Sequence, residues 1–449
     1  MTSHYPRREK TDDVPAFRSP RNCTDLPFLP PPDNLSLPPL PCPPRNPNFA
    51  PGYTLTTHLV PACYPRFTYL HPSPYKSEVA PVPEVFNNAP PDNAPKPVRH
   101  KWSQETGTQL AKRHHYLYNA QPRPPPATSE APALWIAINR YARRRDPKDK
   151  RDFGLTVVMA HANGMHKETW EPTILHLIGL CEKRNSGICI DEVWSIDAVN
   201  HGDSGLVNEK HLMGYIDWLD HTRDIIHFVE NYIPDGPYDP SAPPLPTHLP
   251  RLSPAIAQAR IQNGLKDRHL VGVGHSWSGC CIVNAAISRP NLFLSLNLVD
   301  PVITWIYPRA EYRQVAGALA RRQTWPSREE AKKILKQNPF FAIWHPDVLD
   351  LYVKYGLADS PDGTVRLKTD RFHEASTFAD GHVRQETWNL LPSLDERVKL
   401  RFIMPKNLLV GNPEMANQLV WRRIINTTNV IIDKSVHLMV QQMPYEVGK

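Results

Sequence analysis

A serine between an apolar run and a helical segment is the sharpest chemical signal in this 449-residue sequence. The segment reads Val271-Gly272-Val273-Gly274-His275-Ser276-Trp277-Ser278-Gly279. A nucleophile elbow needs such a strand–turn–helix, with small residues two positions before and after the serine. Gly274 fills the first position, and Ser278 stands where the G-x-S-x-G pattern has its second glycine. The pattern predicts that Ser276 is a nucleophile and that the amide of Trp277 faces an oxyanion; the alternative is an ordinary strand-to-helix turn.

A second oxyanion donor is expected in the turn that follows the apolar run 155–160. This turn reads His161-Ala162-Asn163-Gly164-Met165-His166. A backbone N–H from a turn at this position lies beside the serine when an oxyanion hole is built. The alternative is a glycine turn with two incidental histidines. The polar segment 197–204 follows the next strand, and we expect it to shape the site rather than to react.

His437 is the candidate general base. It follows the apolar run at Ile431 and Ile432 within a short loop, near the end of the sequence. A base in the order serine, acid, histidine comes last along the chain and reaches back to the serine from the end of a sheet strand. This position distinguishes His437 among the 20 histidines of the chain.

Two carboxylates could orient the imidazole of His437. Asp300 closes the apolar run 296–299, and Glu414 follows a later strand-like segment at 407–411. Either could fix the tautomer of the base and stabilise its imidazolium form. Glu414 also follows Pro413 at the start of a helical segment, where a carboxylate complements the helix dipole. Asp300 could instead be a strand-end residue bonded to nearby amides. We favour Asp300, because it requires less excursion of the chain.

Strands and helices alternate over the part of the chain that must position these residues. Nearly all-apolar runs at 155–160, 192–196, 269–274, 292–299, 407–411 and 429–432 predict strands, and segments 170–181, 215–232 and 278–288 predict helices. This alternation predicts an α/β fold with a mostly parallel central sheet flanked by helices. Residues 301–400 break the rhythm and predict a helical cap rich in aromatic residues, among them Trp305, Tyr307, Trp325, Phe340, Phe341 and Trp344.

Proline divides the chain into segments. Of its 50 prolines, most precede residue 133, and a second group lies between Pro234 and Pro250. We expect residues 1–52 to be a Pro-rich arm that is disordered or extended. The core should run from 53 to 300, with Pro-rich inserts near 71–132 and 234–266, and resume from 401 to 449 after the cap. Short runs at 56–62 and 134–141 predict two further strands.

The combination of the segment 161–168 with the segment 274–279 resembles the α/β-hydrolase superfamily. It looks like a fungal branch with peroxisomal lipase-like hydrolases and hydrolases of toxin or other secondary-metabolite biosynthesis, and the segments 325–331 and 352–357 strengthen this resemblance. The resemblance covers roughly 53–70 and 134–449. It implies the α/β-hydrolase fold, a catalytic pair in Ser276 and His437, and an oxyanion role for Asn163.

Composition excludes several other classes of protein. No apolar run approaches the ~18 residues of a membrane span, and the seven cysteines form no CxxC pair. Most of the net charge of +7 lies in residues 101–152, and its densest part, 143–151, reads as a solvated loop, so we expect no nucleic-acid partner. His373, Glu374 and His382 have no usual metal-ligand spacing, and we expect neither metal nor organic cofactor. Cys280 and Cys281 should pack in the core.

The leading hypothesis is therefore a serine hydrolase that cleaves an ester, lactone or thioester of an apolar small molecule through an acyl-enzyme. One alternative is a non-hydrolytic cyclase or lyase on the same fold. Another is a non-catalytic interaction protein whose Pro-rich arm binds a protein partner. The start has no apolar signal region and the ending is not of the Ser-Lys-Leu type, so we expect the cytoplasm rather than the peroxisome.

Overall fold

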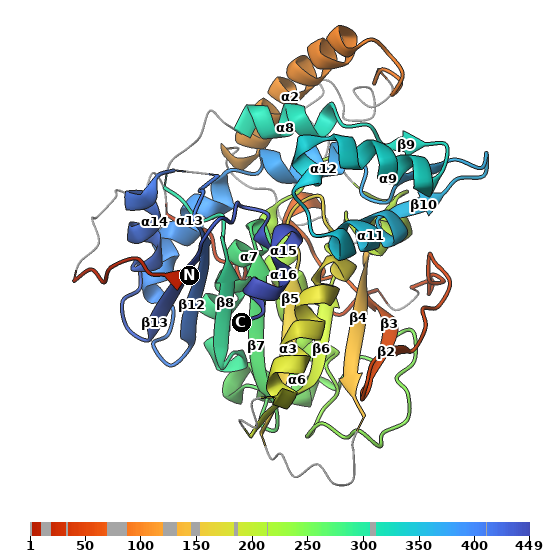
Figure 1. The fold of residues 1–449 in the computed structure, drawn as a ribbon. Coiled ribbons are helices and arrows are strands. Elements are labelled where there is room, and N and C mark those ends of the chain that lie inside the picture. The colour runs from red at the N-terminus through yellow and green to blue at the C-terminus, as the bar shows by residue number, and fades with distance from the viewer. Residues whose placement is uncertain are drawn as a thin grey trace.

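The computed structural model describes residues 2–9, 19–32, 35–69, 88–119, 133–144, 153–183, 187–212, 214–305, 311–409 and 411–449. Ten of its strands form one sheet in the order β1-β13-β12-β8-β7-β5-β6-β4-β3-β2 (Figure 1). The strands are β1 (Thr2–Ser3), β2 (Asn48–Ala50), β3 (Tyr53–Pro61), β4 (Trp135–Arg143), β5 (Phe153–Ala160), β6 (Ile188–Ile196), β7 (His269–His275), β8 (Ser295–Val299), β12 (Lys399–Pro405) and β13 (Thr427–Ile432). From β6 to β13 all neighbours are parallel, which confirms the expected mostly parallel sheet.

Helices cover both faces of this sheet and give it two hydrophobic cores. Along β5, Val158 and Ala160 pack into one core, and Val157 and Met159 into the other, as the alternation of side chains along a strand requires. The first core holds α5 (Trp218–Asn231), α7 (Trp277–Ser288), α13 (His382–Leu390) and α14 (Pro413–Val420). The second holds α3 (Glu171–Lys183), α15 (Met439–Gln442) and α16 (Pro444–Val447). The short helices α4 (Gly202–Asn208) and α6 (Pro254–Asn263) complete the body of the fold.

One expected strand lies at a different place. The segment 407–411 forms no strand over its described residues, 407–409 and 411; the strand is β12, which ends just before it. In β12, Phe402 and Met404 face one core while Ile403 faces the other. By contrast, the side chain of Leu409 is 53% exposed. The run at 407–409 is apolar but follows Pro405, after which the chain leaves the sheet.

The cap lies above the carboxyl ends of the parallel strands (Figure 1). It contains α8 (Glu311–Leu319), α9 (Arg328–Gln337), α10 (Pro339–Ala342), α11 (Pro346–Tyr355) and α12 (Arg371–Ala379). A small antiparallel sheet of β9 (Thr324–Trp325), β11 (Val365–Leu367) and β10 (Leu357–Asp359) joins them. The cap was expected to extend to residue 400, but it ends with α12. The next helix, α13, packs on α7, and its Val383 and Trp388 belong to the core of the body.

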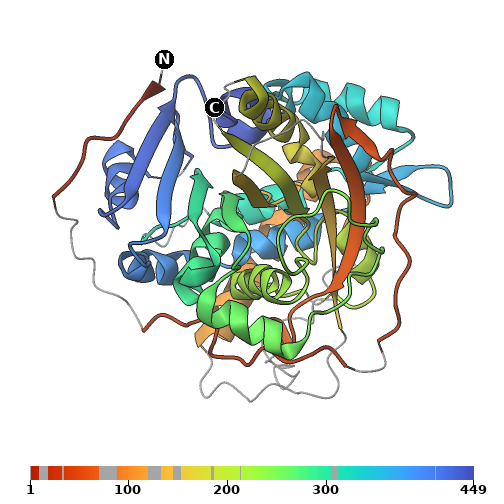
Figure 2. The same ribbon diagram turned by 90° about the horizontal axis from the view of Figure 1, so that it is seen from below.

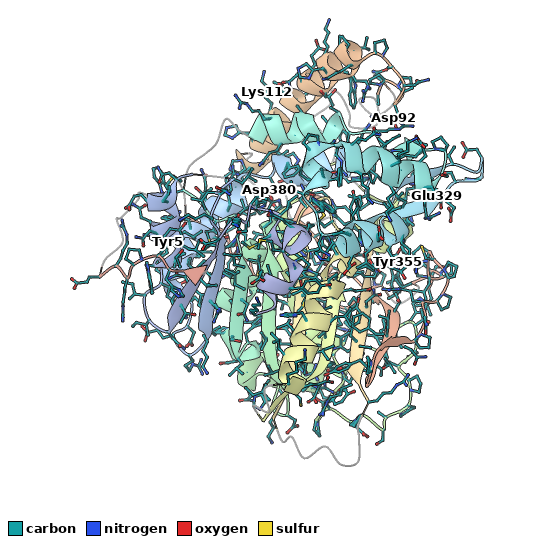
Figure 3. All side chains as sticks on the ribbon, viewed as in Figure 1. Tyr5, Asp92, Lys112, Glu329, Tyr355 and Asp380 are labelled. Atoms are coloured by element: carbon teal, nitrogen blue, oxygen red, sulfur yellow. The ribbon has the colours of Figure 1, made fainter. Side chains whose placement is uncertain are left out.

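The cap also includes a helix that the sequence reasoning assigned to a Pro-rich insert. Helix α2 (Lys96–Asn119) packs against α8 and α12, and its Leu110 shares a buried cluster with Val315 and Phe372. Gly107 allows the close approach to α8, since a Cβ there would lie 3.3 Å from the Ala316 nitrogen. Asp92, labelled in Figure 3, accepts hydrogen bonds from the N–H groups that open β9. Sequence between the prolines therefore supplies part of the cap.

The described parts of the N-terminal arm are packed on the body rather than disordered. In Figure 2 the arm, in red, runs around the outside of the molecule. Cys23 and Leu26 are buried in the core, and Tyr5 (Figure 3) donates its N–H to Asn429. Arg21 donates to both carboxylate oxygens of Glu386 at 2.7 and 2.9 Å. A buried ion pair and strand pairing of β1 with β13 thus hold a segment whose proline content alone predicts disorder.

No helix of the described residues is long and apolar enough to cross a membrane.

Candidate active site

Ser276 occupies the turn between β7 and α7, at the carboxyl end of the parallel strands. Its φ is 61°, in the left-handed region that residues with a Cβ rarely adopt. Gly274 is required beside it, because a Cβ there would lie 2.7 Å from the Cα of Gly279. The same reasoning holds at Gly279, where a Cβ would lie 2.9 Å from Pro301. Strand and helix therefore meet closely enough to hold the serine in a strained turn.

His437 lies in the loop between β13 and α15. Its Nε2 is 2.9 Å from the hydroxyl oxygen of Ser276. The buried hydroxyl of Ser435 donates to the carbonyl of Ile432 and shapes this loop. His275 stands beneath it, with Nε2 2.9 Å from the carbonyl oxygen of His437. Burial and the nearby His437 lower the pKa of His275 to about 3, so its neutral ring donates Nε2–H to that carbonyl.

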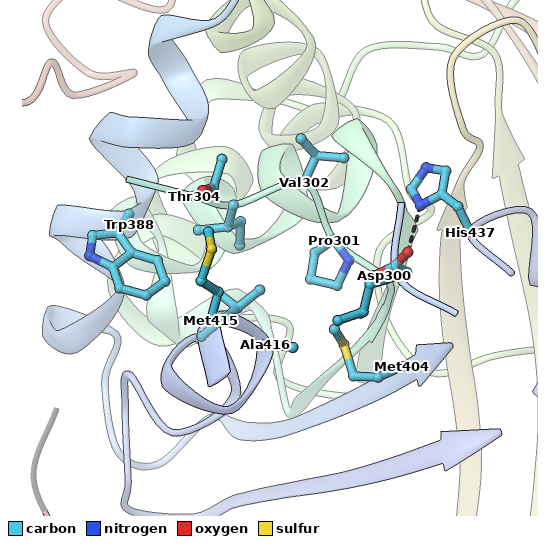
Figure 4. A pocket seen from close by; sticks show the side chains of 12 residues that line it. Asp300, Pro301, Val302, Thr304, Trp388, Met404, Met415, Ala416 and His437 are labelled. Carbon is cyan, nitrogen blue, oxygen red and sulfur yellow. Dashed lines mark hydrogen bonds and ion pairs between the residues drawn. The ribbon is translucent and has the colours of Figure 1, made fainter. Parts of the chain in front are cut away.

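Asp300 contacts the opposite nitrogen of the His437 ring. Its Oδ2 is 2.6 Å from Nδ1 of His437 (Figure 4), and the two side chains are largely buried. Asp300 directly follows β8, with a φ of 38°, and its N–H donates to the carbonyl of Ile403 on β12. A carboxylate in this position makes Nδ1 the protonated nitrogen and leaves the Nε2 lone pair for the hydroxyl of Ser276. The structure thus brings Ser276, His437 and Asp300 into one hydrogen-bonded chain.

Glu414, the alternative acid, lies elsewhere. It occupies the first turn of α14, where Asn412 caps the helix, and its side chain is 58% exposed. Its carboxylate pairs with Arg8 of the N-terminal arm. The position fits the helix-dipole interpretation of this residue.

The two expected oxyanion donors are the backbone N–H groups of Asn163 and Trp277. Asn163 lies in the turn after β5, and Trp277 is the first residue of α7. Among the described residues, neither N–H donates a hydrogen bond to another group of the protein. An N–H in this condition is free to bind an oxygen of a ligand. The side chain of Asn163 is already engaged, because its amide donates to the carbonyl of Glu374 at 3.0 Å.

The cap rests directly on this turn. Besides the bond from Asn163 to Glu374, Asn200 donates to Thr377 of α12 at 2.9 Å. Gly164 has no room for a side chain, since a Cβ there would lie 2.7 Å from a carboxylate oxygen of Glu374. Helix α12 therefore closes over the two loops that follow β5 and β6. The sequence signal for this contact is weak, because asparagine is common in loops of every kind.

A small apolar cavity adjoins the His437–Asp300 pair. Its volume is about 40 Å³, and Figure 4 shows it between the loop after β8 and helix α14. Nine of its twelve lining residues are hydrophobic, namely Pro301, Val302, Ile303, Trp388, Met404, Leu408, Met415, Ala416 and Leu419, and the polar ones are Asp300, Thr304 and His437. The aromatic residues expected in the cap, where the structure describes them, do not line this cavity. Instead Trp325, Phe341 and Trp344 pack with one another inside the cap, Phe340 is exposed, and Tyr307 lies outside the described residues.

The remaining candidates are placed apart from this chemistry. Glu374 pairs with Arg321, and His382 stacks on Tyr118 with ring centroids 3.6 Å apart. Over the described part of the chain, no group of three or more His, Cys, Asp or Glu side chains is arranged to hold a metal ion, and His373 joins no such group. Cys280 and Cys281 are fully buried in the core, as expected.

Fold and sequence together define the family. The model of the α/β hydrolase family matches residues 157–427, and the chain therefore belongs to that family of hydrolases. The peroxisomal α/β-hydrolase Lpx1 of Saccharomyces cerevisiae has the same fold, with a TM-score of 0.55 and 20% sequence identity. The match covers 73% of this chain and 84% of that one.

Several fungal proteins are similar in sequence. The type I acyl-CoA thioesterase mpaH of Penicillium roqueforti (strain FM164) is 28% identical over 243 residues, which cover 53% of this chain and 48% of that protein. The abhydrolase domain-containing protein AFT2-1 of Alternaria alternata is 34% identical over 116 residues, which cover 24% of this chain and 44% of that protein. The chain spans about half the length of the curated relatives it matches.

Proposed function

We propose that the protein is a serine hydrolase that cleaves a thioester or ester of an apolar carboxylic acid through an acyl-enzyme. The observation that carries the proposal is the chain of contacts from Ser276 Oγ to His437 Nε2 at 2.9 Å and from His437 Nδ1 to Asp300 Oδ2 at 2.6 Å. Three groups in this order match the geometry by which a hydroxyl is activated for attack on a carbonyl carbon.

The reaction follows from the position of each group. His437 takes the proton of the Ser276 hydroxyl as the oxygen attacks the carbonyl carbon, and Asp300 stabilises the imidazolium that forms. The negative charge on the carbonyl oxygen meets the N–H groups of Asn163 and Trp277, each contributing about 3 kcal/mol. His437 then protonates the leaving thiolate or alkoxide. A water molecule, deprotonated by the same imidazole, releases the acid and restores Ser276.

The apolar cavity beside the His437–Asp300 pair gives the substrate its chemical character. Away from Asp300, Thr304 and His437 its walls are formed by hydrophobic residues, so a polar or charged substituent placed against them would lose its water with little replacement. A short apolar part of the substrate is stabilised instead. The acyl-CoA thioesterases among the similar proteins make a thioester the first substrate class to test.

The direct test is active-site labelling with a fluorophosphonate, together with thiol release from short acyl thioesters. The wild-type chain should be labelled and should release thiol, and Ser276→Ala should abolish both. The control is Ser393→Ala, which changes an exposed serine. Ser278→Ala is unsuitable as a control, because the hydroxyl of Ser278 is hydrogen-bonded to the turn that carries Asn163. Labelling that persists in Ser276→Ala, at a rate unchanged from the wild type, would contradict the proposal.

Isotope incorporation separates hydrolysis from cyclisation or elimination on the same fold. Turnover in oxygen-18 water must place the label in the carboxylate product, because water attacks the acyl-enzyme. Product without the label would show that Ser276 serves a different reaction.

A further inference from the structure

We propose that Ser278 is a positioning residue that fixes the distance and direction between the two oxyanion donors; this rests on the function proposed above. Ser278 stands where the G-x-S-x-G pattern has glycine. Glycine would satisfy the need for a small residue. The size requirement alone does not explain the hydroxyl of Ser278, so we infer its role from its contacts.

The hydroxyl of Ser278 ties the elbow helix to the turn after β5. Its side chain is fully buried, and Oγ donates to the carbonyl oxygen of His161 at 2.6 Å. His161 comes two residues before Asn163, whose N–H is one of the two oxyanion donors. Ser278 is itself the neighbour of Trp277, which supplies the other donor. One hydrogen bond thus links the two short segments on which the donors lie.

The first two carbonyl groups of the turn, those of His161 and Ala162, each accept a hydrogen bond. The carbonyl of Ala162 accepts from the N–H of Met165 at 3.1 Å and from Nδ1 of His161 at 2.8 Å. Burial lowers the pKa of His161 to about 3, and its neutral ring accepts from the N–H of Ala198 through Nε2. The carbonyl of His161 is held by Ser278 alone among these contacts. Without the hydroxyl, this acceptor has no donor among the described residues, and the turn can rotate to find one.

His221 directs the hydroxyl toward His161. Its Nε2 lies 3.4 Å from Ser278 Oγ. Because the single hydroxyl hydrogen is given to His161, the ring must donate Nε2–H to the oxygen. The ring of His221 also stacks on the indole of Trp277, with centroids 4.7 Å apart. Helix α5 thereby supports both Ser278 and the residue that supplies the second donor.

The test compares Ser278→Ala and Ser278→Gly with a matched control. Thr427→Val removes another buried hydroxyl that donates to a carbonyl at 2.6 Å, at the opposite end of β13 from His437. For both Ser278 variants we expect kcat on a thioester to fall about tenfold, with KM within twofold. A trifluoromethyl ketone, which forms an oxyanion on Ser276, should bind about tenfold more weakly. Thr427→Val should change neither quantity, even where it lowers the melting temperature.

Outcomes separate this inference from the proposed function. If the wild type hydrolyses the thioester and Ser276→Ala does not, but Ser278→Gly keeps kcat and ketone affinity within twofold of wild type, the positioning role is overturned alone. If Ser276→Ala is as active as the wild type, both ideas fail. Should the Ser278 variants not fold, His221→Phe removes the donor to the hydroxyl, and the same loss of kcat and of ketone affinity is expected. Unchanged values in that variant would overturn the role.

Discussion

Oδ2 of Asp300 and Nδ1 of His437 lie 2.6 Å apart, although the strands that precede these two residues are not neighbours in the sheet. Asp300 follows β8 and His437 follows β13, while β12 runs between the two. The loop that carries His437 must therefore cross the carboxyl end of β12. The N–H of Asp300 bonds to Ile403 of β12 and anchors the acid at this crossing.

The first prediction concerns the acid. Asp300→Asn should lower kcat about 10³- to 10⁴-fold, because an amide beside Nδ1 favours the wrong tautomer of His437. Glu414→Gln should leave kcat within twofold, since Glu414 contacts Arg8 at the surface. Steady-state kinetics on one thioester measures both. Equal losses in the two variants would contradict the assignment of Asp300.

The apolar cavity leads to a prediction on acyl-group preference. Ala416→Leu would project extra carbon atoms into a space of only about 40 Å³. We expect KM for a bulkier acyl thioester to rise about tenfold while the acetyl thioester changes less than threefold, since a misplaced methylene is worth about 1–3 kcal/mol. Ala255→Leu, on an exposed position of α6, is the matched control. A uniform change across chain lengths would show that the acyl group binds elsewhere.

Arg21 provides a prediction on the stability of the arm. Its guanidinium is 8% exposed and pairs with Glu386 and Asp217, so Arg21→Ala leaves two buried carboxylates without their cation. We expect a loss of about 3–5 kcal/mol in the free energy of unfolding. Arg397→Ala removes an exposed pair with Asp395 and should cost less than about 1 kcal/mol. Urea denaturation of the three proteins makes the comparison, and equal losses would argue against a packed arm.

The buried His227 predicts a dependence of stability on pH. Burial, with nearby arginines, lowers its pKa to about 3 in the folded chain, against about 6.5 when unfolded. Between these values the unfolded state binds more protons, so the free energy of unfolding falls as the pH drops below 6.5. His227→Gln should reduce the loss between pH 6.5 and 5 by about 2 kcal/mol. His100→Gln, at an exposed position of α2, should not reduce it, and an unaltered slope in His227→Gln would be the contrary result.

Local sequence was most informative where one short segment determines the geometry. The elbow at Ser276 was predictable because Gly274 and Gly279 are needed where the strand and the helix approach too closely for a side chain. The meeting of Asp300 with His437 was a choice between two carboxylates, and only the strand order distinguishes them. The strand at β12 was misplaced because an apolar run also follows it.

Three other features depend on contacts between segments far apart in the chain. The packing of the arm was missed because its proline content does not reveal which residues it contacts. Arg21 pairs with Asp217 and Glu386 only in the folded chain. Helix α2 lies between segments rich in proline, and its apolar positions are covered by α8 and α12 rather than by the body of the fold. Similarly, the hydroxyl of Ser278 reads in the sequence as a loosened motif, and its acceptor on His161 becomes visible only in three dimensions.

The origin of α2 links a distant segment of the chain to the surroundings of Ser276. This helix precedes β4 along the chain, whereas α8 and α12, with which it packs, follow β8. The cap is consequently assembled from two stretches of the polypeptide that are separated along the chain by the strands β4 to β8 of the central sheet. Because α12 also carries the carbonyl of Glu374 that accepts from Asn163, a change in the packing of α2 can reach the turn after β5.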